Sequence, residues 1–455
     1  MIKVIGEGCM SEKLSHMVLG SVRERLFRLD TMAYGLQHFI FGVANAAAIP
    51  VVVGSALGLN AMEIGALAQR TFFFAGLASL IQAFFGHKYP IYEGPAGVWY
   101  TTFVLLATTA VQTGKPLGVL RTDLMTGLFA AGVMTILLGL FKLMPYIRKL
   151  FTPVVNGTFL IVMSLQFSST IAKGLLTMVN GKAILSIDKL GVFFIAIGTI
   201  LVLSLKAKGF IRSMAVLIGT VAGWIVAYPM GAAPSLQAIA AQHQPLLAFP
   251  QIFAWGRPTF DVGVMITALM AGLVVLSNLV ASVSGMDELY KRQEKGSLYS
   301  KTAICTGVAD ILAAIGSVVG FIPYASSIGF ASLTGVLDIL PFIVGSVLMI
   351  VLGLIPAVGN FFATMPITVG YAVMFSVFIM IMGMGINDAA KEGMNTRKTV
   401  ILGFSILISN VITVLPVQAF SILPSSLTYL IANGLIVGVT TAIILEQVIL
   451  PINPN

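Results

Sequence analysis

Apolar runs of about 20 residues recur along nearly the whole chain, and they constrain its fold more than any other feature. A run of that length can cross the roughly 30 Å hydrocarbon core of a bilayer as an α-helix. The runs are continuous, whereas the strands of a membrane β-barrel are short and alternating. Charged residues make up only 9% of the 455, far too few to cover a soluble protein of this size. The sequence therefore predicts an all-α polytopic membrane protein.

The distribution of basic residues gives the expected orientation. If both termini are cytoplasmic, 19 of the 26 Lys and Arg residues fall on the inside and six on the outside. This bias follows the positive-inside rule of cell-membrane proteins. It accounts for the net charge of +9 without nucleic acid as a partner. About 14 spans can be placed, near 32–54, 62–85, 89–111, 123–144, 150–171, 189–205, 212–231, 262–284, 301–318, 320–337, 339–357, 361–385, 399–416 and 426–450.

Two of these spans are interrupted at matching places. Span three opens with residues 89–95, YPIYEGP, and span ten opens with residues 320–329, GFIPYASSIG. Each is the third span of its seven-span half, and the expected extracytoplasmic loop at 232–261 separates the two halves. Because an odd number of spans carries the chain to the other side of the membrane, the two halves would have opposite orientations. Gly/Pro-interrupted segments at corresponding positions of two repeats point to a transporter's binding site, since broken backbone is tolerated only where it lines a cavity or is buried in protein.

Four stretches together resemble the nucleobase–ascorbate transporter family. Residues 35–38, GLQH, with Pro50 look like the family's first span, and residues 152–158, TPVVNGT, resemble its fifth. Residues 433–450 are similar to its last span. Residues 326–335, SSIGFASLTG, keep the Gly, Thr and final Gly of the family's signature near span ten but depart at its first two positions.

The resemblance implies a definite architecture and activity. It implies two inverted seven-span repeats, with short strands from spans three and ten meeting at the substrate. It also implies coupled uptake of uracil, xanthine or a related purine, and a homodimer through the gate domain. The expected parts are a cytoplasmic N-terminal segment at 1–31, a core domain at 32–145 and 262–357, and a gate domain at 146–231 and 358–450.

The usual side-chain anchors of the family are absent. Family members carry a Glu in span eight, where this chain has Ser277 or Asn278, and a Glu or Gln at the position of Ser326. Glu93 is then the leading candidate for both substrate binding and ion coupling. A carboxylate can accept the N–H groups of a base edge, and a carboxyl group inside a membrane can carry a proton. The alternative is a structural acid at a wet vestibule, for which Lys88 is the candidate partner.

The remaining candidates lie beside the breaks or in spans that face them. Each also has a structural reading, as helix–helix hydrogen bonding or as packing. Asp310 in span nine is expected to take part in ion coupling or to have a structural role. The expected substrate-binding residues besides Glu93 are His38, Tyr92, Gly94, Ser277, Asn278, Tyr324, Ser326 and Ser327.

The function favoured by these features is secondary transport of a nucleobase by proton symport, with Na⁺ as the alternative coupling ion. An anion carrier or exchanger of the same fold is the second possibility, because half-helix N-termini suit an anion. An enzyme is not expected, since the acids are scattered and no metal, cofactor or nucleotide motif is present. A repeated channel filter loop is also missing.

Overall fold

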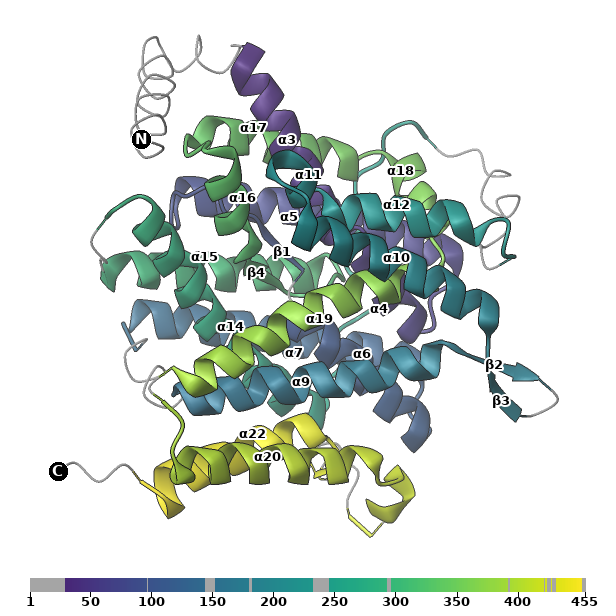
Figure 1. The fold of residues 1–455 in the computed structure, drawn as a ribbon, viewed down its shortest axis with the longest axis vertical. Coiled ribbons are helices and arrows are strands. Elements are labelled where there is room, and N and C mark those ends of the chain that lie inside the picture. Colours follow the sequence, from purple (N-terminus) through teal and green to yellow (C-terminus); the bar gives the residue numbers. More distant parts are fainter. Residues whose placement is uncertain are drawn as a thin grey trace.

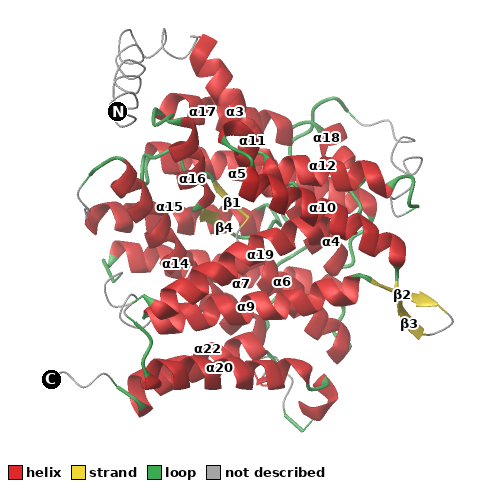
Figure 2. Cartoon of the chain, in the orientation of Figure 1, coloured by secondary structure: helices red, strands yellow, loops and turns green. Residues whose placement is uncertain are grey.

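The computed structural model describes residues 29–95, 97–143, 152–179, 182–231, 245–292, 296–391, 393–420, 422–423, 427 and 431–451. The expected N-terminal segment up to residue 28 and residues 232–244 of the expected loop lie outside these ranges. About 77% of the described residues are helical, and this part of the chain also contains four short strands (Figure 2).

The first half of the chain runs from purple to teal in Figure 1. Asn60 begins one long helix with a capping box, in which it accepts the Glu63 N–H and the Glu63 side chain accepts the Asn60 N–H. The elements are α3 (Leu29–Ala46), α4 (Ala48–Ala56), α5 (Ala61–Phe84), β1 (Glu93–Pro95), α6 (Gly97–Thr113), α7 (Leu117–Leu140), α9 (Pro153–Gly174), β2 (Leu176–Val179), β3 (Lys182–Leu185), α10 (Ile187–Lys206), α11 (Gly209–Ser213) and α12 (Ala215–Ala227).

The second half continues from teal to yellow. Asp261, Asn395 and Asn433 cap three of its helices by accepting backbone N–H groups of the first turn. The elements are α14 (Val262–Leu289), α15 (Gly296–Ile315), β4 (Phe321–Pro323), α16 (Ser326–Thr334), α17 (Ile339–Gly353), α18 (Pro356–Ala363), α19 (Ile367–Ala390), α20 (Thr396–Val414), η1 (Val417–Phe420), α22 (Gly434–Ile444) and a π-helical turn, η2 (Leu445–Ile449).

Within the described residues, nine helices are long and apolar enough to cross a membrane. The number rises to ten if α17 and α18, which meet at 84°, form one broken span. Expected spans three and ten are not among them, because each is divided into a strand and a shorter helix. Expected spans seven and fourteen correspond to shorter apolar helices, α12 and α22 with its π-helical turn.

The helices pack in two groups. In the first group, α7 lies against α14 and α15, and α17 lies against α3 and α5. In the second group, α19 lies against α9, α10 and α12, and α20 pairs with α22 against α9. Figure 1 shows α20 and α22 as a layer beside α9, with α19 next to α9 on its other side.

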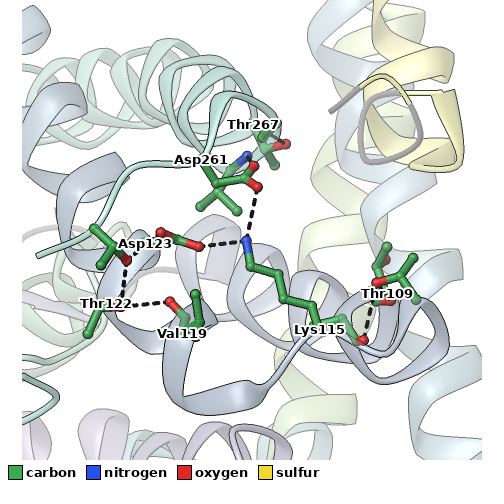
Figure 3. Close-up of polar contacts among 12 residues, drawn as sticks. Thr109, Lys115, Val119, Thr122, Asp123, Asp261 and Thr267 are labelled. Atoms are coloured by element: carbon green, nitrogen blue, oxygen red, sulfur yellow. Dashed lines mark hydrogen bonds and ion pairs between the residues drawn. The ribbon is translucent and has the colours of Figure 1, made fainter. Parts of the chain in front are cut away.

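A partly buried ion cluster ties α7 and α14 of the first group to the end of α6 (Figure 3). Lys115, in the turn between α6 and α7, places its Nζ 2.5 Å from Asp123 Oδ2 and 3.0 Å from Asp261 Oδ2. Asp123 lies on α7, whereas Asp261 caps α14. Thr259 Oγ1 donates to Asp123 Oδ1 at 2.5 Å, so both carboxylate oxygens are occupied. The cluster therefore fixes the start of α14 against the α6–α7 turn.

The cluster shifts the pKa of both groups that lie outside the spans. Partial burial lowers the pKa of Lys115, but hydrogen bonds and charges from Asp123 and Asp261 outweigh it, and the net pKa lies above the ordinary value. Burial alone would raise the pKa of Asp261. The Val264 N–H and the Lys115 ammonium outweigh burial and hold that pKa below its usual range.

We expect Lys115→Met to lower the free energy of unfolding by about 3 kcal/mol, because it leaves the Asp123 carboxylate buried without its cation. Thermal unfolding of the purified protein in detergent measures this. Arg121→Met is the matched control, since Arg121 Nη1 lies 3.8 Å from Glu63, whose side chain is 46% exposed. That loss should stay below about 1 kcal/mol. Equal losses would contradict the account.

The stability of wild type and that of Lys115→Met should depend differently on pH. A lowered carboxyl pKa stabilises the fold fully above the unfolded value of about 3.9, and this contribution is lost as pH falls through the folded pKa. The raised pKa of Lys115 stabilises below about pH 10.4 and is lost as pH rises above that value. The difference between wild type and Lys115→Met should therefore shrink below about pH 4. A difference that stays constant down to pH 3 would contradict this assignment.

Candidate functional site

Two short strands from distant parts of the chain meet among the helices of the first group (Figure 2). β1 and β4 pair antiparallel, with Glu93 opposite Pro323 and Gly94 opposite Ile322. All residues of both strands are buried. A short helix follows each strand, α6 after β1 and α16 after β4. The two interruptions found in the sequence thus form one structural unit.

Side chains from the surrounding helices complete the hydrogen bonding of this unit. Ser79 Oγ of α5 accepts the Glu93 N–H at 3.0 Å, and Asp310 Oδ1 of α15 accepts the Phe321 N–H at 2.8 Å. Ser282 Oγ of α14 donates to the Pro323 carbonyl at 3.0 Å. In a membrane interior these backbone groups would otherwise lack partners, at several kcal/mol each.

Glu93 is the one carboxylic acid on either strand, and its side chain is fully buried. Its Oε1 accepts from Thr306 Oγ1 at 2.7 Å, and Gln82 Nε2 donates to the same Thr306 oxygen at 2.9 Å. Within the described residues Oε2 has no partner that meets hydrogen-bond geometry, and no basic residue pairs with the group. Among the described residues, Glu93 therefore does not pair with Lys88, the partner considered for a structural acid. A buried acid without a cation must be neutralised or must face a ligand.

Two tyrosine hydroxyls flank the same stretch. A Cβ at Gly94 would overlap the Tyr324 hydroxyl, and a Cβ at Gly97 would lie 3.6 Å from the Tyr100 hydroxyl. Both hydroxyls are buried, and neither has a hydrogen-bond partner among the described residues. Glu93 Oε2 and these two phenolic hydroxyls are thus buried atoms with unused hydrogen-bonding capacity at β1 and the start of α6. Gly94 is needed here because any side chain would displace Tyr324.

His38 and Tyr92 lie together but within an aromatic cluster. The His38 ring contacts Phe330 of α16 at 4.9 Å and Phe342 of α17 at 5.8 Å between centroids, and Tyr92 follows at 6.3 Å. Both His38 nitrogens are buried without a partner among the described residues. The Tyr92 backbone N–H donates to Ser327 Oγ at 3.2 Å, so Ser327 supports the strand through the backbone.

The remaining candidates lie on α14 and α16. Ser326 is exposed, and its Oγ lies 3.4 Å from Asn45 Oδ1 of α3. Asn278 is one helical turn before Ser282, and its Oδ1 is buried without a partner among the described residues. Ser277 belongs to α14, but the structure does not describe its side chain.

Several residues at this unit were missed by the sequence reasoning. Each of them is an uncharged polar side chain on an otherwise apolar helix. Such side chains are common along the chain, and the sequence does not indicate which of them contact a strand. Glycines and prolines mark the breaks, but nothing in the sequence marks the side chains that satisfy them. The missed residues are Asn45, Ser79, Gln82, Ser282 and Thr306.

Solved structures show that this fold is shared with membrane transporters. The transmembrane domain of a cyanobacterial bicarbonate transporter, BicA, is similar with a TM-score of 0.59 at 15% identity, covering 91% of this chain and 98% of that one. The murine anion transporter Slc26a9, in the inward-facing state, is similar with a TM-score of 0.57 at 12% identity, covering 91% and 67%. The chain is thus a multi-pass membrane protein with the fold of these transporters.

Sequence comparison gives the family. A xanthine/uracil permease model, described as a permease family, matches residues 29–418, so the chain belongs to that family. A putative purine permease of Bacillus subtilis, YwdJ, is 29% identical over 420 residues, covering 90% of this chain and 94% of that one. The xanthine permease of the same organism is 27% identical, covering 92% and 93%. The xanthine permease XanQ of Escherichia coli is 24% identical, covering 88% and 87%.

We expect Gly94→Ala to lower the free energy of unfolding by about 1–3 kcal/mol, because the added methyl overlaps the Tyr324 hydroxyl. The ring carbon Cζ of Tyr324 would lie 2.6 Å from the same Cβ, so the whole ring must be removed to relieve the overlap. Gly94→Ala should therefore cost much less in a Tyr324→Ala background. Gly329→Ala on α16 is the control, since a Cβ there meets no atom within 4 Å. Thermal unfolding in detergent compares these variants, and Tyr324→Ala alone, with the wild type. A Gly94→Ala loss of the same size in the Tyr324→Ala background would place the overlap elsewhere.

Proposed function

We propose that the protein is a secondary transporter that imports a nucleobase, such as uracil, xanthine or another purine, by proton symport. The observation that carries the proposal is the fully buried Glu93, which has one unused carboxyl oxygen and begins a strand whose next residue, Gly94, meets the unused Tyr324 hydroxyl. The names of its relatives as purine, xanthine and uric acid permeases support this class of cargo. The transporter would act in the cell membrane with both termini cytoplasmic.

The chemistry of the site suits a planar base with N–H and C=O edges. Glu93 Oε2 would accept one or two base N–H groups, as carboxylates do in base recognition. The Tyr100 and Tyr324 hydroxyls would donate to base carbonyls, and their rings offer apolar faces for the heterocycle. His38, Tyr92 and Ser327 would support this arrangement from behind the strand. Ser277, Asn278 and Ser326 would complete the polar lining.

Coupling to an ion follows from the same uncompensated charge. Glu93 and Asp310 are both fully buried, and each keeps one oxygen without a partner among the described residues. A proton taken up at this pair removes the cost of a bare carboxylate in the membrane interior. Binding of a base to Glu93 would then be linked to the protonation of its surroundings. Na⁺ is the alternative coupling ion, with the same oxygens as ligands.

We propose that the two packing groups are the core domain (32–145 and 262–357) and the gate domain (146–231 and 358–450). The pattern of helix contacts supports two inverted repeats of seven spans. α5 packs on α17, and its expected counterpart α15 packs on α7, the counterpart of α17. In the same way, α3 packs on α17, and its expected counterpart α14 packs on α7. Movement of one group against the other would expose the strand pair to each side in turn, and a homodimer would form through the gate domain.

An anion carrier or exchanger is the second candidate, because the solved structures with this fold include a bicarbonate and an anion transporter. The first turns of α6 and α16 would attract an anion. Glu93 argues against it, since a second negative charge at the same place is unfavourable. Competition of labelled xanthine uptake by uracil and guanine against bicarbonate and sulfate separates the two. Competition by bicarbonate alone would favour the anion carrier.

We expect Glu93→Gln to lower the efficiency of nucleobase uptake at least about tenfold, because a charge-assisted hydrogen bond is lost. Thr306→Val should give a smaller loss, since it removes the donor that orients Oε1. Glu63→Gln, at the exposed start of α5, is the control and should transport normally. Uptake and a pH dependence that are both unchanged in Glu93→Gln would rule out its role.

Asp310→Asn tests coupling separately from structure. An Asn oxygen can still accept the Phe321 N–H, so the fold should be retained. We expect the variant to lose accumulation driven by a pH gradient while it still exchanges bound cargo across the membrane. Full gradient-driven accumulation in Asp310→Asn would leave Asp310 with a structural role only.

A further inference from the structure

The two half-helices that follow the strands have different surroundings. Along the first turn of α6, residues 98–102 are each at most 3% exposed. On α16, Ser326, Gly329 and Ser332 lie at three-residue spacing on one face, and all three are exposed. A Cβ at Gly329 would meet no atom within 4 Å. The first turn of α6 is therefore covered, whereas one face of α16 is exposed.

An aromatic trio makes the contact on the covered side. The Tyr100 ring meets Phe167 of α9 and Phe378 of α19 edge-on, each at 5.8 Å between centroids. Those two phenyl rings stack on each other at 4.3 Å. One turn earlier, a Cβ at Gly97 would lie 2.9 Å from Ile381 Cδ1 of α19. The trio thus joins α6, which packs with the first group, to two helices of the second group.

This contact can separate without leaving new unpaired polar groups. It consists of ring edges and faces, and the Tyr100 hydroxyl has no hydrogen-bond partner among the described residues that separation would remove. The ion cluster of Lys115 is different, because it ties helices within the first group and its disruption would leave charges unpaired. An apolar cavity of about 20 Å³ adjoins α6, α9, α14 and α22, and its lining includes Thr102 and Phe159. Packing of α6 and α14 against α9 and α22 is therefore incomplete at Thr102.

We propose that Tyr100, Phe167 and Phe378 form the barrier that closes the site on the α6 side. When the second group moves relative to α6, Tyr100 leaves the two phenyl rings and Thr102 becomes accessible, while the Ser326–Gly329–Ser332 face becomes covered. This inference rests on the proposed transport function for the exchange between two states, but it is independent of which cargo is carried.

Cysteine accessibility in membrane vesicles tests the barrier. Cys9 and Cys305 are replaced by Ala, and either Thr102→Cys or Ser332→Cys is introduced. A membrane-impermeant maleimide is added to right-side-out and inside-out vesicles without any cargo. We expect Ser332→Cys to react from one side, and Thr102→Cys to react at least about tenfold more slowly, from the opposite side. Adding Phe378→Ala should raise the Thr102→Cys rate about tenfold.

Controls separate the barrier from general loosening. Phe193→Ala removes another buried phenyl, which meets Phe375 of α19 at 5.7 Å inside the second group, and it should leave the Thr102→Cys rate unchanged. Tyr100→Phe keeps the ring and should also leave it unchanged. Tyr100→Leu should act like Phe378→Ala, and it replaces that variant if Phe378→Ala does not give a monodisperse protein.

Two results would overturn the barrier. One is a Thr102→Cys rate equal to that of Ser332→Cys in the starting protein, and the other is an equal effect of Phe193→Ala and Phe378→Ala. Because labelling is measured without cargo, a failure of nucleobase uptake would bear on the proposed function and leave this test intact.

Discussion

Unpaired backbone at two helix breaks is the constraint on which the rest of this structure depends. A membrane interior offers no water to the N–H and C=O groups that Gly and Pro release from their helices. The two strands use some of this capacity by pairing with each other, Glu93 opposite Pro323. Ser79, Ser282 and Asp310 use more of it from three neighbouring helices. The first packing group is therefore organised around the breaks, and the site is a consequence of that arrangement.

The same arrangement explains where charge is placed. Ser79 and Asp310 have equivalent tasks, since each binds the N–H of the residue that begins a strand, yet one is neutral and the other is an acid. Glu93 adds a second acid close to this unit, and no described basic residue compensates either one. Such an imbalance is costly in a membrane and is typical of ion and substrate pathways. Under the proposed transport function, this imbalance would serve cargo binding and coupling.

Much of the fold could be predicted from the sequence, and much of the site could not. Apolar runs and capping residues such as Asn60 and Asp261 indicate the helices, and Pro95 and Pro323 indicate the two breaks. Thr306 and Ser282 could not be found, because Ser and Thr recur on many apolar helices and only packing decides which of them meet a strand. Lys115 and Asp261 are 146 residues apart, so their ion pair is equally hidden. The β2–β3 hairpin had a usable signal, Asn180-Gly181 between two short runs.

The most direct test of the central claim is an experimental structure of the protein with a bound nucleobase. The account predicts density for the base at residues 94–97, with a ring N–H within about 3 Å of Glu93 Oε2 and a carbonyl facing the Tyr100 or Tyr324 hydroxyl. Density for the base away from the strand pair, with the Glu93 carboxyl not in contact with it, would contradict the account.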